Sequence, residues 1–264
     1  MIKANFHTHT FRCNHAGCSD QRYVDLAIEA GIETLGFSDH TPYVGFEGDF
    51  YSFYRMRPEQ LSDYVESVNS LKKQYNGKIN IHLGLEAEYY PKLFLGLVEF
   101  LKPYGIEYLI LGQHYIDDDQ YGLSVYHITT EEQLKKYADQ CIEAMETGLF
   151  SYLAHPDIPN IDRKDPAFER EMRRICIRAK ELNIPLEVNV LGIVRERCYP
   201  CEKFLRICKE CENTVILGID AHLPDQFHDT ESISKAISLI EKYDLKTTDK
   251  IDLKRLPEYY AKNI

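Results

Sequence analysis

Nine side chains that could bind metal ions recur along this 264-residue chain, each close to the end of an expected strand. Imidazole and carboxylate groups are common ligands of divalent metal ions in proteins. Seven of the ten histidines fall in this set, so histidine is concentrated at these positions. The nine residues are His7, His9, His15, His40, Glu86, His114, His155, Asp220 and His222. A series of ligands at successive strand ends predicts a multinuclear metal centre.

Local spacing adds detail to this prediction. His7 and His9 are two residues apart in an expected strand, so both imidazoles point to the same face. Glu86 ends a later strand, and a carboxylate can bridge two cations where an imidazole cannot. We predict that Glu86 and Asp220 are catalytic as well as metal-binding residues. The other histidines, His82, His127 and His228, are expected to be packed or solvated.

The elements that must position these residues form seven rounds of strand, loop and helix, separated by glycine or proline. The expected strands are Ile2–His9, Thr34–Asp39, Ile79–Glu86, Tyr108–Gln113, Tyr152–Ala154, Leu186–Val190 and Thr214–Asp220. The expected helices are Asp20–Ala30, Arg57–Tyr75, Pro91–Lys102, Thr130–Thr147, Pro166–Leu182, Glu202–Glu212 and Ser232–Tyr243. Strands that alternate with amphipathic helices imply a parallel sheet.

A closed barrel fits the ligand positions better than an open sheet. Six of the seven strands end in a ligand, and β/α barrels build their sites from several strand ends at one face. The glycine-rich loops of open nucleotide-binding sheets, G-x-G-x-x-G and G-x4-G-K-[ST], do not occur in the chain. We therefore predict an α/β fold, a seven-stranded (β/α)7 barrel in a single domain spanning residues 1–264. The last twenty residues are expected to pack across the barrel bottom or its final gap.

Composition narrows the classes of partner. The net charge is −11, which argues against long DNA or RNA as a partner but is compatible with a small phosphorylated metabolite. The sequence shows no signal peptide and no apolar run near the ~20 residues of a membrane span. We expect a soluble cytoplasmic protein without a membrane partner. The oligomeric state stays open.

Four of the eight cysteines form the pattern Cys198-x2-Cys201-x6-Cys208-x2-Cys211. Paired C-x2-C motifs can bind a structural zinc ion. The six-residue gap is short for such a site, and the segment also fits a helix with Cys208 and Cys211 near one face. We favour small core residues over a zinc knuckle.

Three arginines are candidate substrate-binding residues. Arg163, Arg195 and Arg197 lie in loops after the fifth and sixth strands, on the expected metal face, and a guanidinium suits bidentate phosphate binding. Residues 41–57 form a long loop with six aromatic residues directly after His40. This loop could cover the site as a lid or pack against the barrel rim.

Several motifs together resemble those of the PHP (polymerase and histidinol phosphatase) family. The motifs run from residue 7 to residue 222 and are His7-Thr8-His9-Thr10, His15, Ser38-Asp39-His40, Gly84-Leu85-Glu86-Ala87-Glu88-Tyr89, Gln113-His114, Ala154-His155-Pro156-Asp157, Leu186-Glu187-Val188-Asn189 and Gly218-Ile219-Asp220-Ala221-His222. The stretch from Arg55 to Pro91 is similar to the stand-alone histidinol-phosphatase branch. The arginine after strand six falls at 195, one residue later than in similar phosphatases.

The resemblance implies a distorted seven-stranded barrel that holds up to three metal ions. One ion would bind His7, His9, Glu86 and Asp220; a second would share Glu86 and add His114 and His155; a third would bind His15, His40 and His222. The cofactors would be two to three divalent ions of zinc, iron or manganese. Clustered divalent ions lower the pKa of a bridging water and neutralise phosphate oxygens.

The function expected from the residues and the resemblance is metal-dependent phosphomonoester hydrolysis. Histidinol phosphate is the favoured substrate, giving L-histidinol and phosphate. One alternative is a PHP phosphoesterase that acts on nucleotides or short oligonucleotides. Another is a non-catalytic barrel that serves as an interaction module, although the complete ligand set argues against it.

Overall fold

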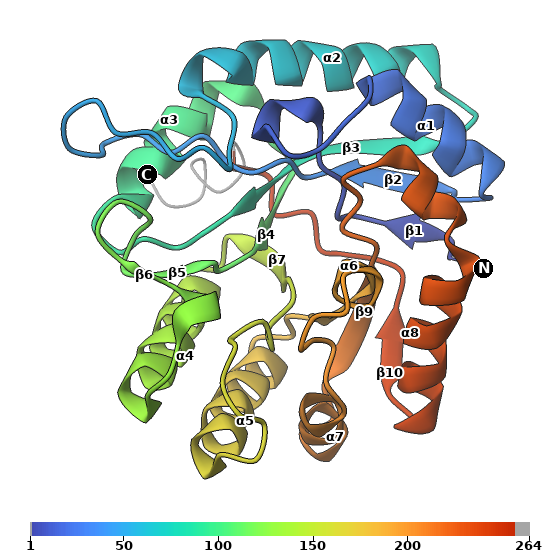
Figure 1. Ribbon diagram of the computed structural model, residues 1–264. Helices are drawn as coiled ribbons and strands as arrows, with labels where there is room; N and C mark the ends of the chain where they lie inside the picture. Colours follow the sequence, from blue (N-terminus) through green and yellow to red (C-terminus); the bar gives the residue numbers. More distant parts are fainter. Residues whose placement is uncertain (1, 257–264) are drawn as a thin grey trace.

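Eight parallel strands form one curled sheet in the computed structural model, which describes residues 2–256 (Figure 1). Their order in the sheet is β1-β2-β3-β4-β7-β8-β9-β10. Their bounds are β1 Ala4–Asn5, β2 Thr34–Phe37, β3 Asn80–Ala87, β4 Tyr108–Leu111, β7 Phe150–Leu153, β8 Leu186–Asn189, β9 Thr214–Gly218 and β10 Lys246–Thr248. The first seven confirm the predicted strands, mostly with shorter bounds, and the parallel α/β class is confirmed as well.

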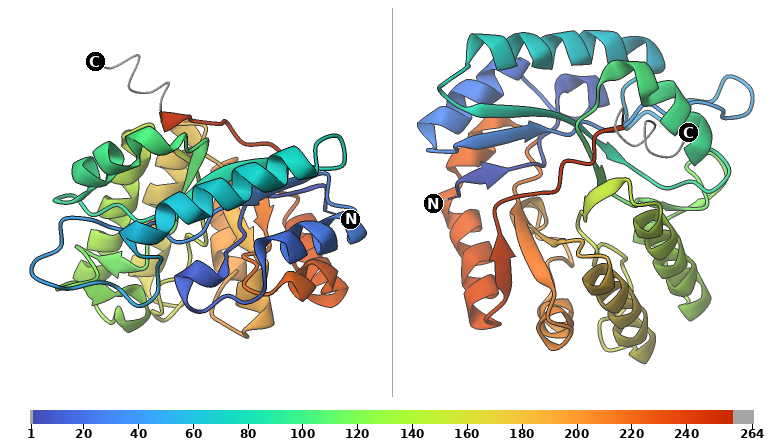
Figure 2. Two further views of the ribbon diagram at one scale, coloured as in Figure 1. Left: turned by 90° about the horizontal axis from the view of Figure 1, so that it is seen from above. Right: turned by 180° about the vertical axis from the view of Figure 1, so that it is seen from behind.

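Helices cover the outer face of the sheet (Figures 1 and 2). The α-helices are α1 Asp20–Glu29, α2 Leu61–Gln74, α3 Phe94–Leu101, α4 Glu131–Glu146, α5 Pro166–Glu181, α6 Val190–Val194, α7 Glu202–Glu210 and α8 Thr230–Lys242. The 3-10 helices are Phe11–Cys13, Pro58–Gln60, Lys102–Tyr104, Val125–His127 and Pro224–His228. Side chains cap the starts of α1 and α4, where Ser19 accepts from the Arg22 amide and Thr130 from the Gln133 amide. All seven predicted helices are confirmed within a few residues at each end.

One tyrosine spans the inside of the curled sheet. The buried Tyr108 hydroxyl donates to the carbonyls of Phe6 and Phe37, at 2.9 Å in both cases. Gly36 and Gly84 leave room for its ring, because a Cβ at either position would lie within 2.3 Å of Tyr108 atoms. These glycines belong to the strand ends that carry His40 and Glu86, so the interior packing helps to fix the site above it.

β1 and β9, which are not neighbours in the sheet, come together on the side where the strands end. The amide of His9 donates to the carbonyl of Ala221 at 2.9 Å, and the amide of Ala221 donates to the carbonyl of His7 at 3.1 Å. The segments after β1 and β9 are therefore paired directly. This contact brings the first and last ligand-bearing segments side by side.

The C-terminal segment closes the opposite side. Beyond β10 the chain crosses the bottom of the barrel (Figure 2), where Ser151 donates to the Asp252 carbonyl at 2.7 Å and the Leu256 amide to the Ile106 carbonyl at 3.3 Å. Ile251 and Leu253 pack against the apolar cluster that contains Phe6 and Tyr108. The predicted packing of the tail is confirmed as far as residue 256, and residues 257–264 lie outside the described part of the chain.

Three short strands and one short α-helix were not predicted. β10 has three residues, none of them apolar, and pairs with β9 in the final gap of the sheet. The hairpin strands β5 Tyr115–Ile116 and β6 Leu123–Ser124 have two residues each, and α6 has five. Segments this short carry no readable periodicity. The predicted count of seven strands is therefore corrected to eight.

The cysteine pattern of α7 resolves as packing. Cys208 is fully buried in the main hydrophobic core, and its Sγ lies 3.8 Å from Cys176 Sγ on α5. Cys211 packs against the same core at its edge. The core interpretation is confirmed for Cys208, and its nearest thiol partner comes from a different helix.

Candidate metal centre

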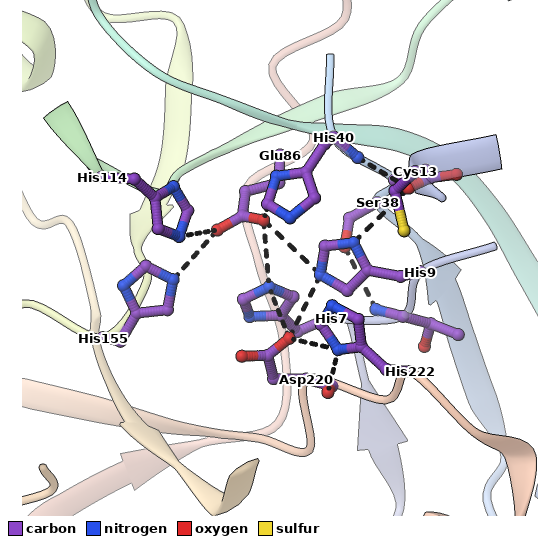
Figure 3. Close-up of polar contacts among 12 residues, drawn as sticks. His7, His9, Cys13, Ser38, His40, Glu86, His114, His155, Asp220 and His222 are labelled. Atoms are coloured by element: carbon purple, nitrogen blue, oxygen red, sulfur yellow. Dashed lines mark hydrogen bonds and ion pairs between the residues drawn. The ribbon is translucent and has the colours of Figure 1, made fainter. Parts of the chain in front are cut away.

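The nine predicted ligands converge at the mouth formed by the strand ends, with Glu86 at the centre, and Figure 3 labels all of them except His15. Glu86 Oε2 lies 3.0 Å from His40 Nδ1 and 3.5 Å from Nε2 of both His7 and His9. Its other oxygen, Oε1, lies 3.0 Å from His155 Nε2 and 3.8 Å from His114 Nε2. The carboxylate therefore faces two groups of imidazoles, one with each oxygen.

Asp220 is a second carboxylate that contacts His7 and His9. Its Oδ1 lies 3.1 Å from His9 Nε2, 3.4 Å from His7 Nε2 and 3.3 Å from His222 Nδ1. The ring of His222 stacks on that of His9 with centroids 4.1 Å apart. His15 completes this side, with its ring centroid 4.7 Å from that of His222.

The backbone turns sharply where two ligands leave their strands. Asp220 and His155 have φ angles of +58° and +30°, a region that non-glycine residues seldom adopt. Close approach explains two nearby glycines. A Cβ on Gly112 would lie 1.8 Å from Glu86 Oε1, and a Cβ on Gly218 would lie 1.8 Å from Glu187 Oε1. Such local strain is common where a chain must aim functional side chains.

Buried carboxylates stand behind three of the histidines. Glu187 Oε1 lies 2.8 Å from His7 Nδ1, and Asp39 Oδ1 lies 3.5 Å from His9 Nδ1. Glu88 Oε1 lies 3.2 Å from His114 Nδ1. The contacts to His7 and His114 occupy Nδ1 and leave Nε2 directed at the cluster, an arrangement that orients metal-binding imidazoles. No role for these acids was expected from the sequence. Glu88 could have been found, because it follows Glu86 by two residues and so points to the same face of the extended chain.

The electrostatics of the inner residues are strongly coupled. Burial alone lowers the pKa of His7, but Asp220, Glu187 and Glu86 outweigh burial and raise the pKa to about 10. Burial raises the pKa of Glu86 and Asp220, but the surrounding imidazoles hold both pKa values well below the ordinary range. Without a metal ion, these groups therefore compensate one another as ion pairs. A cation that binds here must displace imidazole protons.

The outer histidines are in the opposite state. Burial, with the neighbouring His9 adding to it, lowers the pKa of His222 to about 3. Burial likewise lowers the pKa of His15 and His40. These three imidazoles stay neutral at pH 7 and keep a lone pair free for a cation.

The donor set fits bound cations. Several buried atoms in the cluster have no hydrogen-bond partner within the described residues, and these are His7 Nε2, His9 Nε2, His9 Nδ1, His155 Nδ1, Glu86 Oε2 and Asp220 Oδ1. Buried polar atoms are normally paired, so partnerless atoms that face one another suggest a missing partner. Overlapping groups within the nine residues, such as His9 with His40 and His222, hold their donor atoms within 4.8 Å.

A cavity of about 550 Å³ opens above the cluster. The described residues that line it are His15, His40, Tyr54, Arg55, Glu86, Glu88, His114, Tyr115, Ser124, Tyr126, His127, His155, Leu191, Arg195, Arg197, Tyr199, Asp220 and His222. The predicted arginines Arg195 and Arg197 are among them, and Arg197 lies 4.9 Å from the ring centre of Tyr126. His127, expected to be solvated, is exposed and also borders the cavity.

Arg163 takes a different place from the one predicted. Within residues 2–256 it is not among the residues that line the cavity. Its guanidinium donates to the carbonyls of Asp157, Pro159, Ile161 and Cys198, at 2.6 to 3.3 Å. Arg163 therefore joins its own loop to the segment of Cys198, and its guanidinium is engaged by backbone carbonyls away from the cavity.

The loop of residues 41–57 packs partly against the barrel rim and partly borders the cavity. Tyr43 is buried against the ring of Tyr90, with centroids 4.5 Å apart. Tyr54 is 57% exposed, lines the cavity and meets His15 edge to face. The loop therefore anchors one aromatic residue in the barrel and presents another at the mouth.

The fold and the site define a curled α/β barrel with a histidine- and carboxylate-rich mouth suited to metal-dependent chemistry. The PHP domain model matches residues 5–191, and the chain belongs to the PHP domain family. No helix in the described part of the chain has the length and apolar character needed to span a membrane.

Relatives and solved structures agree with this assignment. The "Probable histidinol-phosphatase" of Deinococcus radiodurans is 26% identical over 228 residues, which cover 83% of this chain and 86% of that protein. The histidinol-phosphatase of Bacillus subtilis is 30% identical over 125 residues, 45% of this chain and 46% of that one. Histidinol phosphate phosphatase from Lactococcus lactis, complexed with zinc, L-histidinol and phosphate, has the same fold. That structure matches with a TM-score of 0.72 and 22% identity, over 95% of this chain and 99% of the other.

Proposed function

We propose that this protein is a metal-dependent phosphomonoesterase that hydrolyses L-histidinol phosphate to L-histidinol and phosphate. The observation that carries the proposal is the convergence of nine candidate ligand side chains, several with partnerless buried atoms, beneath a cavity that Arg195 and Arg197 border. Two relatives, matched over 86% and 46% of their own lengths, carry a histidinol-phosphatase name, which supports the substrate. A barrel that served only as an interaction module would have no need for such a complete donor set.

The metal ions belong to this proposal. The nitrogen and oxygen donors suit zinc, iron or manganese, and nine ligands are too many for one ion. We assign His7, His9, Glu86 and Asp220 to one ion, and Glu86, His114 and His155 to a second. A third would be held by His15, His40 and His222, whose lowered pKa values favour neutral imidazoles. The expected content is two to three divalent ions per chain.

The chain's own residues would prepare the substrate for this chemistry. Bound divalent ions supply charge neutralisation for phosphoryl oxygens and a lowered pKa for water. Arg195 and Arg197 would hold the phosphate edge that faces away from the cluster, through paired donors. Glu86 and Asp220 keep the imidazoles oriented, and their negative charge balances the cations.

The tyrosines of the cavity wall favour a small aromatic metabolite. Tyr54, Tyr115, Tyr126 and Tyr199 line it, and such rings suit the face of an imidazole. A volume of about 550 Å³ lies in the usual range for small-molecule sites. The net charge of −11 opposes extended nucleic acid, so a nucleotide-directed activity is the weaker candidate.

A substrate panel tests the proposal. Protein loaded in turn with manganese, iron or zinc is assayed with histidinol phosphate, other phosphorylated metabolites, nucleoside monophosphates and a short oligonucleotide. Histidinol phosphate should give the highest kcat/KM. A protein that binds at least two metal equivalents yet hydrolyses no phosphomonoester would overturn the proposal, and preference for a nucleotide would replace the substrate.

A further inference from the structure

One buried arginine at the mouth is fully engaged by the chain itself. Arg55 is 4% exposed, although it borders the cavity. Its Nη2 donates to Glu88 Oε1 at 2.9 Å and to Asp119 Oδ2 at 2.8 Å, and its Nε to the same Asp119 oxygen at 3.2 Å. Its Nη1 donates to the Thr41 carbonyl at 3.3 Å. The guanidinium is therefore committed to chain partners rather than free for a phosphate.

Glu88 connects this arginine to a candidate ligand. The Glu88 side chain is 2% exposed and contacts Arg55 and His114 with the same oxygen, Oε1. Its other oxygen accepts from the Tyr90 hydroxyl at 2.5 Å and from the His114 amide at 3.3 Å. Glu88 thus fixes both the backbone and the ring of His114. With Nδ1 engaged by Glu88, the ring presents Nε2 to Glu86.

The same arginine joins two separate loops. Arg55 lies in the loop of residues 41–57, and Asp119 lies in the turn between β5 and β6. The Asp119 side chain is 1% exposed. Within the described residues, the positive group that pairs with it is the guanidinium of Arg55. The loop of residues 41–57 contributes Tyr54 to the cavity wall, and the hairpin that carries Asp119 contributes Tyr115 from β5. One guanidinium therefore links the cover of the cavity to the metal ligand beneath it.

We infer that Arg55 is a positioning residue that sets the orientation of His114 through Glu88, so that the order of the mouth loops and the integrity of the metal centre depend on each other. This inference rests on the proposed function only for its activity readout. Without Arg55, the buried carboxylates of Glu88 and Asp119 lose their cation, and an uncompensated buried charge forces its surroundings to rearrange. Loss of such partners behind a ligand typically weakens metal binding or activity by about 10- to 100-fold.

The test compares four variants with a matched control. Arg55→Gln removes the charge, Glu88→Gln removes the contact to His114, and Arg55→Gln/Glu88→Gln combines them. Arg57→Gln is the control, because Arg57 lies in the same loop but is exposed, with its guanidinium 4.0 Å from the Tyr51 ring centre. Arg55→Lys keeps the buried charge and covers the case in which Arg55→Gln does not fold. Manganese and zinc binding is measured by titration in metal buffers, and kcat and KM by steady-state assay.

We expect one metal equivalent to bind about 10- to 100-fold more weakly in Arg55→Gln and Glu88→Gln than in wild type. The double variant should bind metal no more weakly than the single variant with the lower metal affinity, because the two residues act through one contact. kcat should fall more than KM rises, and excess metal should restore part of it. Arg55→Lys should be intermediate, and Arg57→Gln should match wild type.

Other outcomes would overturn the inference. Wild-type metal affinity in Arg55→Gln together with a raised KM would make Arg55 a substrate-binding residue. Additive losses in the double variant would show that Arg55 does not act through Glu88. The metal titration needs no substrate. If the wild-type protein has no phosphatase activity, the proposed function is wrong, but the metal affinities of the variants still test the role of Arg55.

Discussion

The substitution Glu86→Gln should be the most damaging change to a single ligand. Glutamine keeps the shape of the side chain but replaces one oxygen with an NH2 group and removes the charge. The two oxygens of Glu86 face different imidazoles, with His40 and His155 both at 3.0 Å. An amide therefore places a donor against one group of imidazoles whichever way it is oriented. No orientation of glutamine can serve both sides.

The expected size of the effect follows from this double role. Loss of a bridging carboxylate should disturb two metal ions, and metal ions contribute several kcal/mol to charge stabilisation in the transition state. We expect kcat to fall by ~10³ or more, which corresponds to about 4 kcal/mol. Metal content should fall by at least one equivalent in the same preparation.

Steady-state kinetics and elemental analysis on the same preparation measure both effects, with circular dichroism as the check on folding. Glu107→Gln is the matched control, because Glu107 is also a glutamate beside a histidine, with Oε2 3.5 Å from His82 Nδ1. Among the described residues, Glu107 does not line the cavity. A folded Glu86→Gln protein within tenfold of the wild-type kcat would refute the bridging role.

Other predictions address the arginines, the metal content and the response to acid. Arg197→Ala should raise KM for a phosphomonoester with little change in Tm. Arg163→Ala should lower the free energy of unfolding by about 1–3 kcal/mol and leave KM nearly unchanged, because four carbonyls lose their donor. The reverse pattern in kinetics and melting would contradict both assignments. Elemental analysis of protein purified without chelator should find two to three divalent ions per chain, and one or fewer after reconstitution would exclude a trinuclear centre. Burial raises the pKa of Glu107, but His82 and Lys72 outweigh it and lower the pKa to about 2 from the ordinary 4.5, so these contacts stabilise the fold above about pH 4.5 and are lost as the pH falls toward 2. Urea unfolding at pH 5 and pH 3 should therefore show a smaller acid-induced loss in Glu107→Gln than in wild type, and equal losses would count against the lowered pKa.

The sequence was sufficient to predict that these candidate ligands converge, because most of them obey a local rule. His7 and His9 share a strand face, and parallel strand ends meet at one mouth, so the meeting of the side chains at the strand ends follows from strand order. The supporting contacts obey no such rule. Arg55 and Asp119 are 64 residues apart and lie in loops without periodicity, so only the folded chain brings them together.

The arginine predictions show the same limit in another form. Arg163 and Arg197 are both loop arginines after strands, and sequence patterns give them equal standing. Their difference is the direction of the guanidinium, which in Arg163 turns back to its own loop and in Arg197 borders the cavity. Likewise, the spacing of cysteines on α7 could not reveal that Cys208 meets Cys176 from α5.

The barrel floor has a consequence for the order in which the protein is made. Phe6 belongs to the first strand segment, but Leu253, which packs on the same apolar cluster, comes almost at the end of the chain. At the usual rates of synthesis, roughly 12 to 50 s separate the two residues on the ribosome. During that interval the apolar side chains of the floor are without their final cover. A nascent chain that stopped before residue 250 would leave this surface open to water, and we expect aggregation rather than loss of metal to be the first sign of such a truncation.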